Sequence, residues 1–155
     1  MSSVNIIPYE GQYQAEFKRI NEAWISKFFV MEEADYQALD HPEEKILNPG
    51  GAIVLAELGG KIVGTCALIK MSDDQYELAK MGVDENAQGH GIGYKLGMAV
   101  IEKAKELGGK KVYLETNSKL TPALSLYRKL GFVDVEDFPT PYERCNVQMM
   151  LDLSI

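Results

Sequence analysis

Three glycines, Gly89, Gly91 and Gly93, stand at alternate positions just before a stretch with helical periodicity. The first N–H groups of a helix have no intrahelical partners and bind phosphate oxygens well. Glycine places no Cβ between the backbone and such an anion. A helix that merely begins with flexible residues is the alternative, although three glycines in five positions cost backbone entropy. The segment therefore indicates a phosphate or pyrophosphate site.

Two common phosphate-binding motifs do not fit this segment. The dinucleotide fingerprint needs glycines at i, i+2 and i+5, but Tyr94 or Leu96 occupies the last position. The P-loop ends in Gly-Lys-Ser or Gly-Lys-Thr, and that ending does not occur in this loop. A nucleotide-binding regulator is therefore disfavoured.

Two segments together point to one family. Gln88–Gly93 resembles the Gln/Arg-x-x-Gly-x-Gly/Ala motif of GNAT N-acetyltransferases, and Leu124–Phe132 is similar to their Leu-Tyr-x-Lys-x-Gly-Phe element. The spacing between the motifs also fits. The resemblance covers nearly the whole chain and is specific from Glu77 to Phe132. It implies direct attack by a primary amine of a small molecule or peptide on acetyl-CoA, in a ternary complex.

Two other functions would show the same two motifs. A non-catalytic GNAT-fold module would bind acetyl-CoA or a metabolite without turnover, and a transferase of another acyl group would keep every feature. Tyr127 and Glu77 favour an enzyme over the binding module, because a module needs neither an acid nor a base.

The resemblance also assigns residues to the co-substrate. The expected pyrophosphate loop consists of Gln88, Gly89, His90, Gly91, Ile92, Gly93 and Tyr94. The strand whose backbone pairs with the pantetheine arm matches Met81, Gly82 and Val83. Many relatives carry an asparagine seven residues before the tyrosine, where this chain has Leu120. Asn117, one turn earlier, is the candidate replacement.

Tyr127 and Glu77 are the expected catalytic pair. Tyr127 matches the family tyrosine that protonates the leaving thiolate, and its alternative role is a packed ring. Glu77 matches a glutamate base of some members, and its alternative is a solvent-facing glutamate. Strand alternation places Glu77, Ala79, Met81 and Val83 on one face. Glu77 would then lie about 13 Å from Met81 and act through water. Backbone N–H groups near Met81 are expected to stabilise the oxyanion.

Two further features have open interpretations. The aromatic segment Trp24–Glu33 either roofs the acceptor site or packs in the core, and core packing is favoured. Arg144 either pairs with an acceptor carboxylate or lies at the surface or a sheet edge, and the second is favoured.

Periodicity and turn residues predict the elements that position these groups. Apolar spacing and Gly/Pro breaks predict a mixed α/β order with antiparallel and parallel strand pairs. The GNAT resemblance implies that these elements form a mixed sheet of about seven strands, splayed between its two central strands and flanked by helices. Strands are expected at Val4–Ile7, Ala52–Leu58, Lys61–Lys70, Gln75–Val83, Lys111–Glu115, Phe132–Val135 and Arg144–Leu153. Helices are expected at Tyr13–Phe28, Glu32–Leu39, Ile92–Leu107 and Thr121–Leu130, with a helical turn at Glu43–Leu47.

Composition limits the remaining classes. The 155 residues fit a single domain over residues 1–155, and the net charge of −7 argues against nucleic acid. Cys66, Cys145, His41 and His90 lack metal-ligand spacing, so no metal is expected. Neither a signal peptide nor a membrane-length apolar run occurs, which favours a cytoplasmic protein. The chain is expected to be a monomer, or a homodimer paired through its last strand.

Overall fold

A seven-stranded sheet organises the computed structural model, which describes residues 3–136 and 138–154. The strand order is β1-β2-β3-β4-β5-β7-β6. The strands are β1 (Val4–Pro8), β2 (Ala52–Leu58), β3 (Lys61–Lys70), β4 (Gln75–Val83), β5 (Lys111–Thr116), β6 (Val133–Val135) and β7 (Val147–Asp152). The helices are α1 (Gln14–Phe28), α2 (Glu33–Asp40), α3 (Ile92–Glu106) and α4 (Thr121–Leu130), with short turns η1 (Gly11–Tyr13), η2 (Glu43–Leu47) and η3 (Glu85–Ala87).

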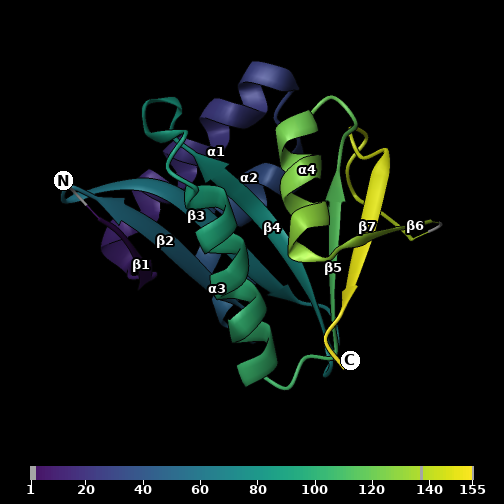
Figure 1. Cartoon of the computed structure of the whole chain (residues 1–155). Helices are drawn as coiled ribbons and strands as arrows, with labels where there is room; N and C mark the ends of the chain where they lie inside the picture. Colours follow the sequence, from purple (N-terminus) through teal and green to yellow (C-terminus); the bar gives the residue numbers. More distant parts are fainter. Residues whose placement is uncertain (1–2, 137, 155) are drawn as a thin grey trace.

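The helices cover both faces of the sheet. Helices α3 and α4 lie in front of it in Figure 1, and α1 and α2 lie behind it. Each face has its own apolar core. Leu96 and Val100 belong to the core under α3, whereas Phe17 and Leu39 belong to the core under α1 and α2. The sheet is thus the middle layer of three, which is how a mostly buried sheet hides both of its apolar faces.

The expected fold class is confirmed. The three meander strands and α4 have the predicted bounds, and the expected helical turn at Glu43–Leu47 is present. The last strand starts later than expected, at Val147 instead of Arg144. The single domain expected over residues 1–155 stays a prediction, and residues 1, 2, 137 and 155 lie outside the described residues.

The sheet splits between β4 and β5, the parallel pair at its centre. These strands pair only from Gln75 to Glu77 on β4 and from Lys111 to Tyr113 on β5. Beyond that point the two strands diverge, as Figure 1 shows. The facing edges of β4 and β5 are therefore not paired with each other beyond Glu77 and Tyr113.

A bulge interrupts β4 just where the strands have separated. Ala67 pairs with Ala79 and Thr65 with Gly82, so Lys80 and Met81 together oppose Cys66 alone. Lys80 has φ of 51°, and no other non-glycine residue in the described ranges has positive φ. The left-handed conformation costs about 1–2 kcal/mol for a residue with a side chain.

The bulge overturns the expectation that Glu77, Ala79, Met81 and Val83 share one face. Glu77 is paired with Ile69, which packs in the core on the α1 side. Met81 and Val83 instead pack against the core on the α3 side. The extra residue in a bulge reverses the alternation of the side chains that follow it.

The same bulge sends the side chain of Lys80 into a buried ion cluster. Its Nζ donates hydrogen bonds to Asp35 Oδ1 at 2.6 Å and to Tyr142 Oη at 2.9 Å. Arg144 donates to both carboxylate oxygens of Asp35, at 2.6 and 2.7 Å, and to Glu32 at 3.3 Å. Burial alone would raise the pKa of Asp35, but these hydrogen bonds and the Lys80 charge hold it at about 2. The cluster joins α2, β4 and the loop before β7.

We predict that Asp35→Asn destabilises the protein by about 3–5 kcal/mol, because it leaves Lys80 and Arg144 buried without their shared counter-charge. Urea unfolding at pH 7 measures this loss. The folded-state pKa lies below the unfolded value of about 3.9. The wild-type advantage is therefore present above about pH 4 and is lost as the pH falls towards 2.

Asp40→Asn is the matched control. Asp40 pairs with Lys18 in an ion pair whose side chains are 36% and 37% exposed, so its loss should cost about 0–1 kcal/mol. Equal losses in the two variants would contradict a special role for the buried cluster.

Candidate active site

One cavity of about 1440 Å³ passes through the splayed sheet. It runs from the glycine loop ahead of α3, between β4 and α4, to a chamber under α1 and α2. All but one of the residues proposed for co-substrate binding and catalysis line it. These are Glu77, Met81, Gly82, Val83, Gln88, Gly89, Gly91, Ile92, Gly93, Tyr94, Asn117 and Tyr127. Residues distant in sequence thus meet in one space.

The glycine loop forms one end of the cavity. Gly89 and Gly91 have φ of 89° and 69°, in the left-handed region that glycine adopts without strain. Gly91 is the N-cap of α3, and the first helical bond runs from Lys95 N to its carbonyl. A Cβ on either glycine would meet no atom within 4 Å. The space beside these two glycines, just ahead of α3, is therefore open.

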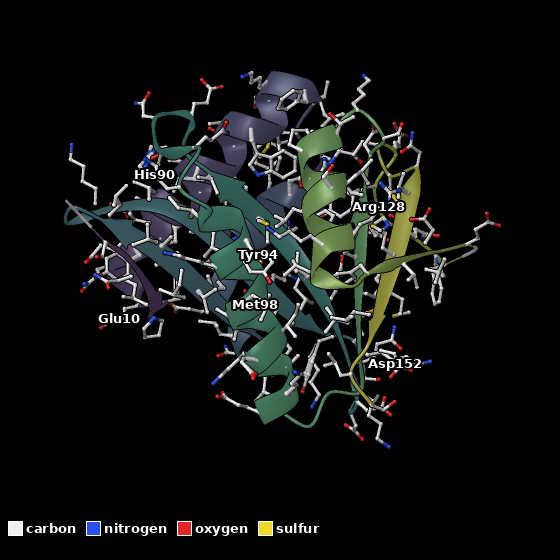
Figure 2. All side chains as sticks on the ribbon, viewed as in Figure 1. Glu10, His90, Tyr94, Met98, Arg128 and Asp152 are labelled. Carbon is white, nitrogen blue, oxygen red and sulfur yellow. The ribbon has the colours of Figure 1, made fainter. Side chains whose placement is uncertain are left out.

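His90 is the exception among the predicted site residues, because it does not line the cavity. Its side chain is exposed on the loop that precedes α3, whereas Tyr94 projects from the first turn of that helix (Figure 2). The Lys129 ammonium lies 4.8 Å from the centre of the Tyr94 ring.

Asn117 lines the cavity, but its amide already has partners within the protein. Its Nδ2 donates to the carbonyl of Arg144 at 2.7 Å, and its Oδ1 accepts from the N–H of Lys119 at 2.9 Å. The side chain thus shapes the turn before α4 and ties it to the loop before β7. Its replacement of the family asparagine at the co-substrate stays a prediction.

Tyr127 is both a packed ring and a cavity residue. It is 8% exposed, belongs to the core on the α3 side and meets Phe132 edge-on at 6.1 Å. Burial raises the pKa of its hydroxyl, which keeps the proton in place throughout the neutral range. The two roles considered for Tyr127 are therefore compatible.

The other end of the cavity holds a pair of carboxyl groups, Glu77 and Glu115. Glu115 accepts hydrogen bonds from Tyr113 Oη at 2.7 Å and from Thr140 Oγ1 at 2.8 Å. Burial and then the charge of Glu115 raise the pKa of Glu77 to about 7, against a smaller opposing effect of Lys80. A carboxyl group with this pKa can accept a proton at neutral pH.

Comparison with known sequences decides the family. The sequence pattern of the Acetyltransferase (GNAT) family matches residues 17–132, most of the chain. The chain belongs to this family. Members of the GNAT family are acetyl-CoA-dependent acyltransferases, so the chain is an enzyme of that class. The Uncharacterized N-acetyltransferase YjgM of Escherichia coli K12 is 33% identical over 120 residues, covering 74% of this chain and 72% of that protein.

Solved structures agree with this GNAT assignment. A GNAT-family acetyltransferase from Staphylococcus aureus Mu50 has a TM-score of 0.90 and 29% identity, covering 98% of this chain and 100% of its own. The Salmonella typhimurium protein yncA, solved with its cofactor acetyl-CoA, has a TM-score of 0.79 and 20% identity, covering 99% of this chain and 96% of its own. At that identity the second likeness shows the fold alone.

The wall of this GNAT acetyltransferase cavity under α1 and α2 is aromatic. Trp24, Phe29 and Tyr142 line it, so the segment Trp24–Glu33 does contribute to the chamber. The favoured position of Arg144, at the surface or a sheet edge, is wrong. Arg144 precedes β7, its side chain is only 14% exposed, and its guanidinium lies 4.4 Å from the centre of the Tyr142 ring. Asp35 and Glu32 are its carboxylate partners.

Sequence reasoning missed Lys80, which lines the cavity, and its fully buried partner Asp35. A lysine inside a strand normally indicates a solvent-facing position, and no local pattern links it to an aspartate 45 residues earlier. Within residues 3–136 and 138–154 no group of three or more His, Cys, Asp or Glu side chains is placed to hold a metal. No described helix is long and apolar enough to cross a membrane.

Proposed function

We propose that this enzyme transfers an acetyl group from acetyl-CoA to a primary amine of a small molecule or peptide, with both substrates bound together. One observation carries the proposal: a single cavity connects the glycine loop, which suits a pyrophosphate, to the carboxyl pair, which suits an amine. The substrates would enter from opposite ends and meet beside the β4 bulge.

The acetyl-CoA end is supported by backbone geometry. The N–H groups of Ile92, Gly93 and Tyr94 open α3 and lack intrahelical acceptors, so they are available to a pyrophosphate. The pantetheine arm would lie in the gap beside β4, near Met81 and Val83, where the ladder to β5 has ended. The fold neighbour yncA was solved with acetyl-CoA, which supports acetyl-CoA as the co-substrate.

The reaction needs two proton transfers around one bond exchange. The neutral amine nitrogen attacks the thioester carbonyl carbon, a C–N bond forms and the C–S bond breaks. Glu77 takes the proton that the nitrogen loses, through water, and Tyr127 protonates the leaving thiolate. A free thiol has a pKa of about 8.5. Because burial raises the pKa of Tyr127 above its usual value, this phenol is a weaker acid than the thiol, so we expect a modest acid contribution.

Direct attack by the amine is favoured over an acyl-cysteine intermediate. Cys145 lies in the cavity wall, but burial and the charge of Glu115 raise the pKa of its thiol. Cys66 is fully buried, and burial raises its pKa strongly. A thiolate is the nucleophilic form of cysteine, and both sites disfavour it.

A panel of amines tests the function itself. We predict that amino acids, alkyl amines, amino sugars or peptides include an acceptor that releases CoA thiol from acetyl-CoA in the presence of wild-type enzyme. Initial-velocity lines for the two substrates should intersect, as a ternary complex requires. Parallel lines would indicate an acyl-enzyme, and no release with any amine class would remove the proposed function.

The glycine loop is tested by a charge placed at Gly91. We predict that Gly91→Asp weakens CoA binding at least tenfold in calorimetry, because the added carboxylate repels the pyrophosphate. Aspartate tolerates the left-handed region, and its charge suits a helix N-terminus, so the fold should be retained.

Two control variants isolate the charge. Gly91→Asn has the same shape without the charge and should lose less affinity. Gly60→Asp places an aspartate at φ of 82° in the β2–β3 turn, where a Cβ also meets no atom within 4 Å, and should bind CoA normally. Equal affinity of Gly91→Asp and wild type would mean that the pyrophosphate binds elsewhere.

The base is tested by pH. We predict that Glu77→Gln lowers kcat/KM most between about pH 7 and pH 10. Below about 7 the wild-type carboxyl is itself protonated, so its advantage shrinks. Above about 10.4, the pKa of a lysine-like ammonium, most of the acceptor is already free amine and hydroxide can take the proton that the nitrogen loses, so the advantage of Glu77 shrinks again. The acidic limb of the wild-type profile, near pH 7, should disappear in the variant. A constant activity ratio from pH 6 to 10 would exclude Glu77 as the base.

A further inference from the structure

A chain of buried polar groups ends on the carbonyl of Lys80, the residue with positive φ in the β4 bulge. Thr65 Oγ1 donates to that carbonyl at 2.9 Å. Asn21 Nδ2 donates to Thr65 Oγ1, also at 2.9 Å, and Trp24 Nε1 donates to Asn21 Oδ1 at 3.0 Å. Asn21 and Thr65 are completely buried, so each must find its partner inside the protein.

The residues around the bulge hold both the backbone and the side chain of Lys80. Thr65 stands opposite Gly82, the first residue paired after the bulge. A Cβ on Gly82 would lie 2.7 Å from the Trp24 ring, so glycine lets the indole pack directly on the strand. The Lys80 side chain is held separately, by Asp35 and Tyr142. The left-handed residue is therefore fixed at its carbonyl and at its ammonium.

We propose that Thr65, supported by Asn21 and Trp24, is a positioning residue that holds the β4 bulge in the conformation required for catalysis. The proposal rests on the proposed function. A bulge removes a residue from the strand ladder, and Lys80 and Met81 are the residues without their own partners on β3. Locking the Lys80 carbonyl fixes the peptide plane between Lys80 and Met81, and with it the direction of the Met81 N–H.

That direction matters because the cavity passes this point. Met81 lines the cavity between the glycine loop and the carboxyl pair. A fixed N–H here polarises the thioester carbonyl and stabilises the oxyanion that forms on it. A flat strand would point this peptide along the ladder to β3. The hydrogen-bonded groups from Asn21 to the Lys80 carbonyl stabilise the bulged strand relative to a regular strand. Trp24 connects these groups to the wall of the acceptor chamber.

The experiment measures the carbonyl stretch of acetyl-CoA labelled with ¹³C at the thioester carbon, by infrared difference spectroscopy. A hydrogen bond to the carbonyl lowers this frequency relative to acetyl-CoA in water-free solvent. We expect the lowered frequency with wild type and with Thr65→Ser, which keeps the hydroxyl. Thr65→Val has the same shape without the hydroxyl, and we expect the frequency to rise while the Kd for CoA stays within about twofold.

Turnover provides a second measurement, with acetyl-CoA and an acceptor taken from the amine panel. Displacing a reacting group by about 1 Å can cost about 100-fold in rate. We therefore expect Thr65→Val to lower kcat by about 10- to 100-fold with little change in KM, and Thr65→Ser to recover most of it. A loss confined to KM, or an unchanged carbonyl frequency in Thr65→Val, would overturn the proposal.

One more variant covers the case in which Thr65→Val fails to fold. If Thr65→Val does not fold, Trp24→Phe removes only the outer donor of the chain and should raise the frequency partially; an unchanged frequency would then overturn the proposal. Absence of acetyl-CoA binding to wild type would instead refute the proposed function.

Discussion

The end of hydrogen bonding between β4 and β5 is the constraint on which the rest of the structure depends. Three residue pairs hold the strands together, and then the sheet opens. Buried backbone N–H and C=O groups need partners. Strands that part inside a protein therefore require something else in the gap, and an extended chain with its own amide groups meets that requirement. A pantetheine arm is such a chain.

The ion cluster under α2 stabilises this opening on one side. A split sheet loses cross-strand support, and the loop before β7 has no regular partner of its own at that level. Asp35 connects α2 to the Lys80 bulge and to Arg144 on that loop through bonds of 2.6–2.7 Å. Desolvating these charges is costly, and apolar packing of equal volume would serve stability as well. We infer that the charged groups serve to fix positions. Their directional hydrogen bonds hold the bulge and the loop before β7 relative to α2 more strictly than apolar contacts would.

Much of the fold followed from local sequence patterns. Gly59-Gly60 between two β-branched runs predicted the hairpin of β2 and β3, and the spacing of Ile92, Leu96 and Val100 predicted α3. The glycine loop and Tyr127 were found because local motifs mark them. The bulge was not found, because it is defined by the pairing of β4 with β3 and by the bond from Thr65, and no local motif marks Lys80. The partners of Arg144 were missed for a related reason: Asp35 lies 109 residues away and only the fold brings the two together.

The bulge also separates the two proposed proton transfers. Glu77 precedes it and faces the core side of α1 and α2, whereas Tyr127 comes from α4 on the opposite side of the sheet. A base and an acid in direct contact would exchange a proton with each other and leave both in the wrong state. Here the sheet layer stands between them, with the cavity passing through it at the point where the backbone changes direction. The amine would lose its proton on one side, the thiolate would gain one on the other, and the carbonyl under attack would lie between them at Met81. Lys80, the residue with left-handed backbone, thus lies where side chains of one strand switch from one face of the sheet to the other.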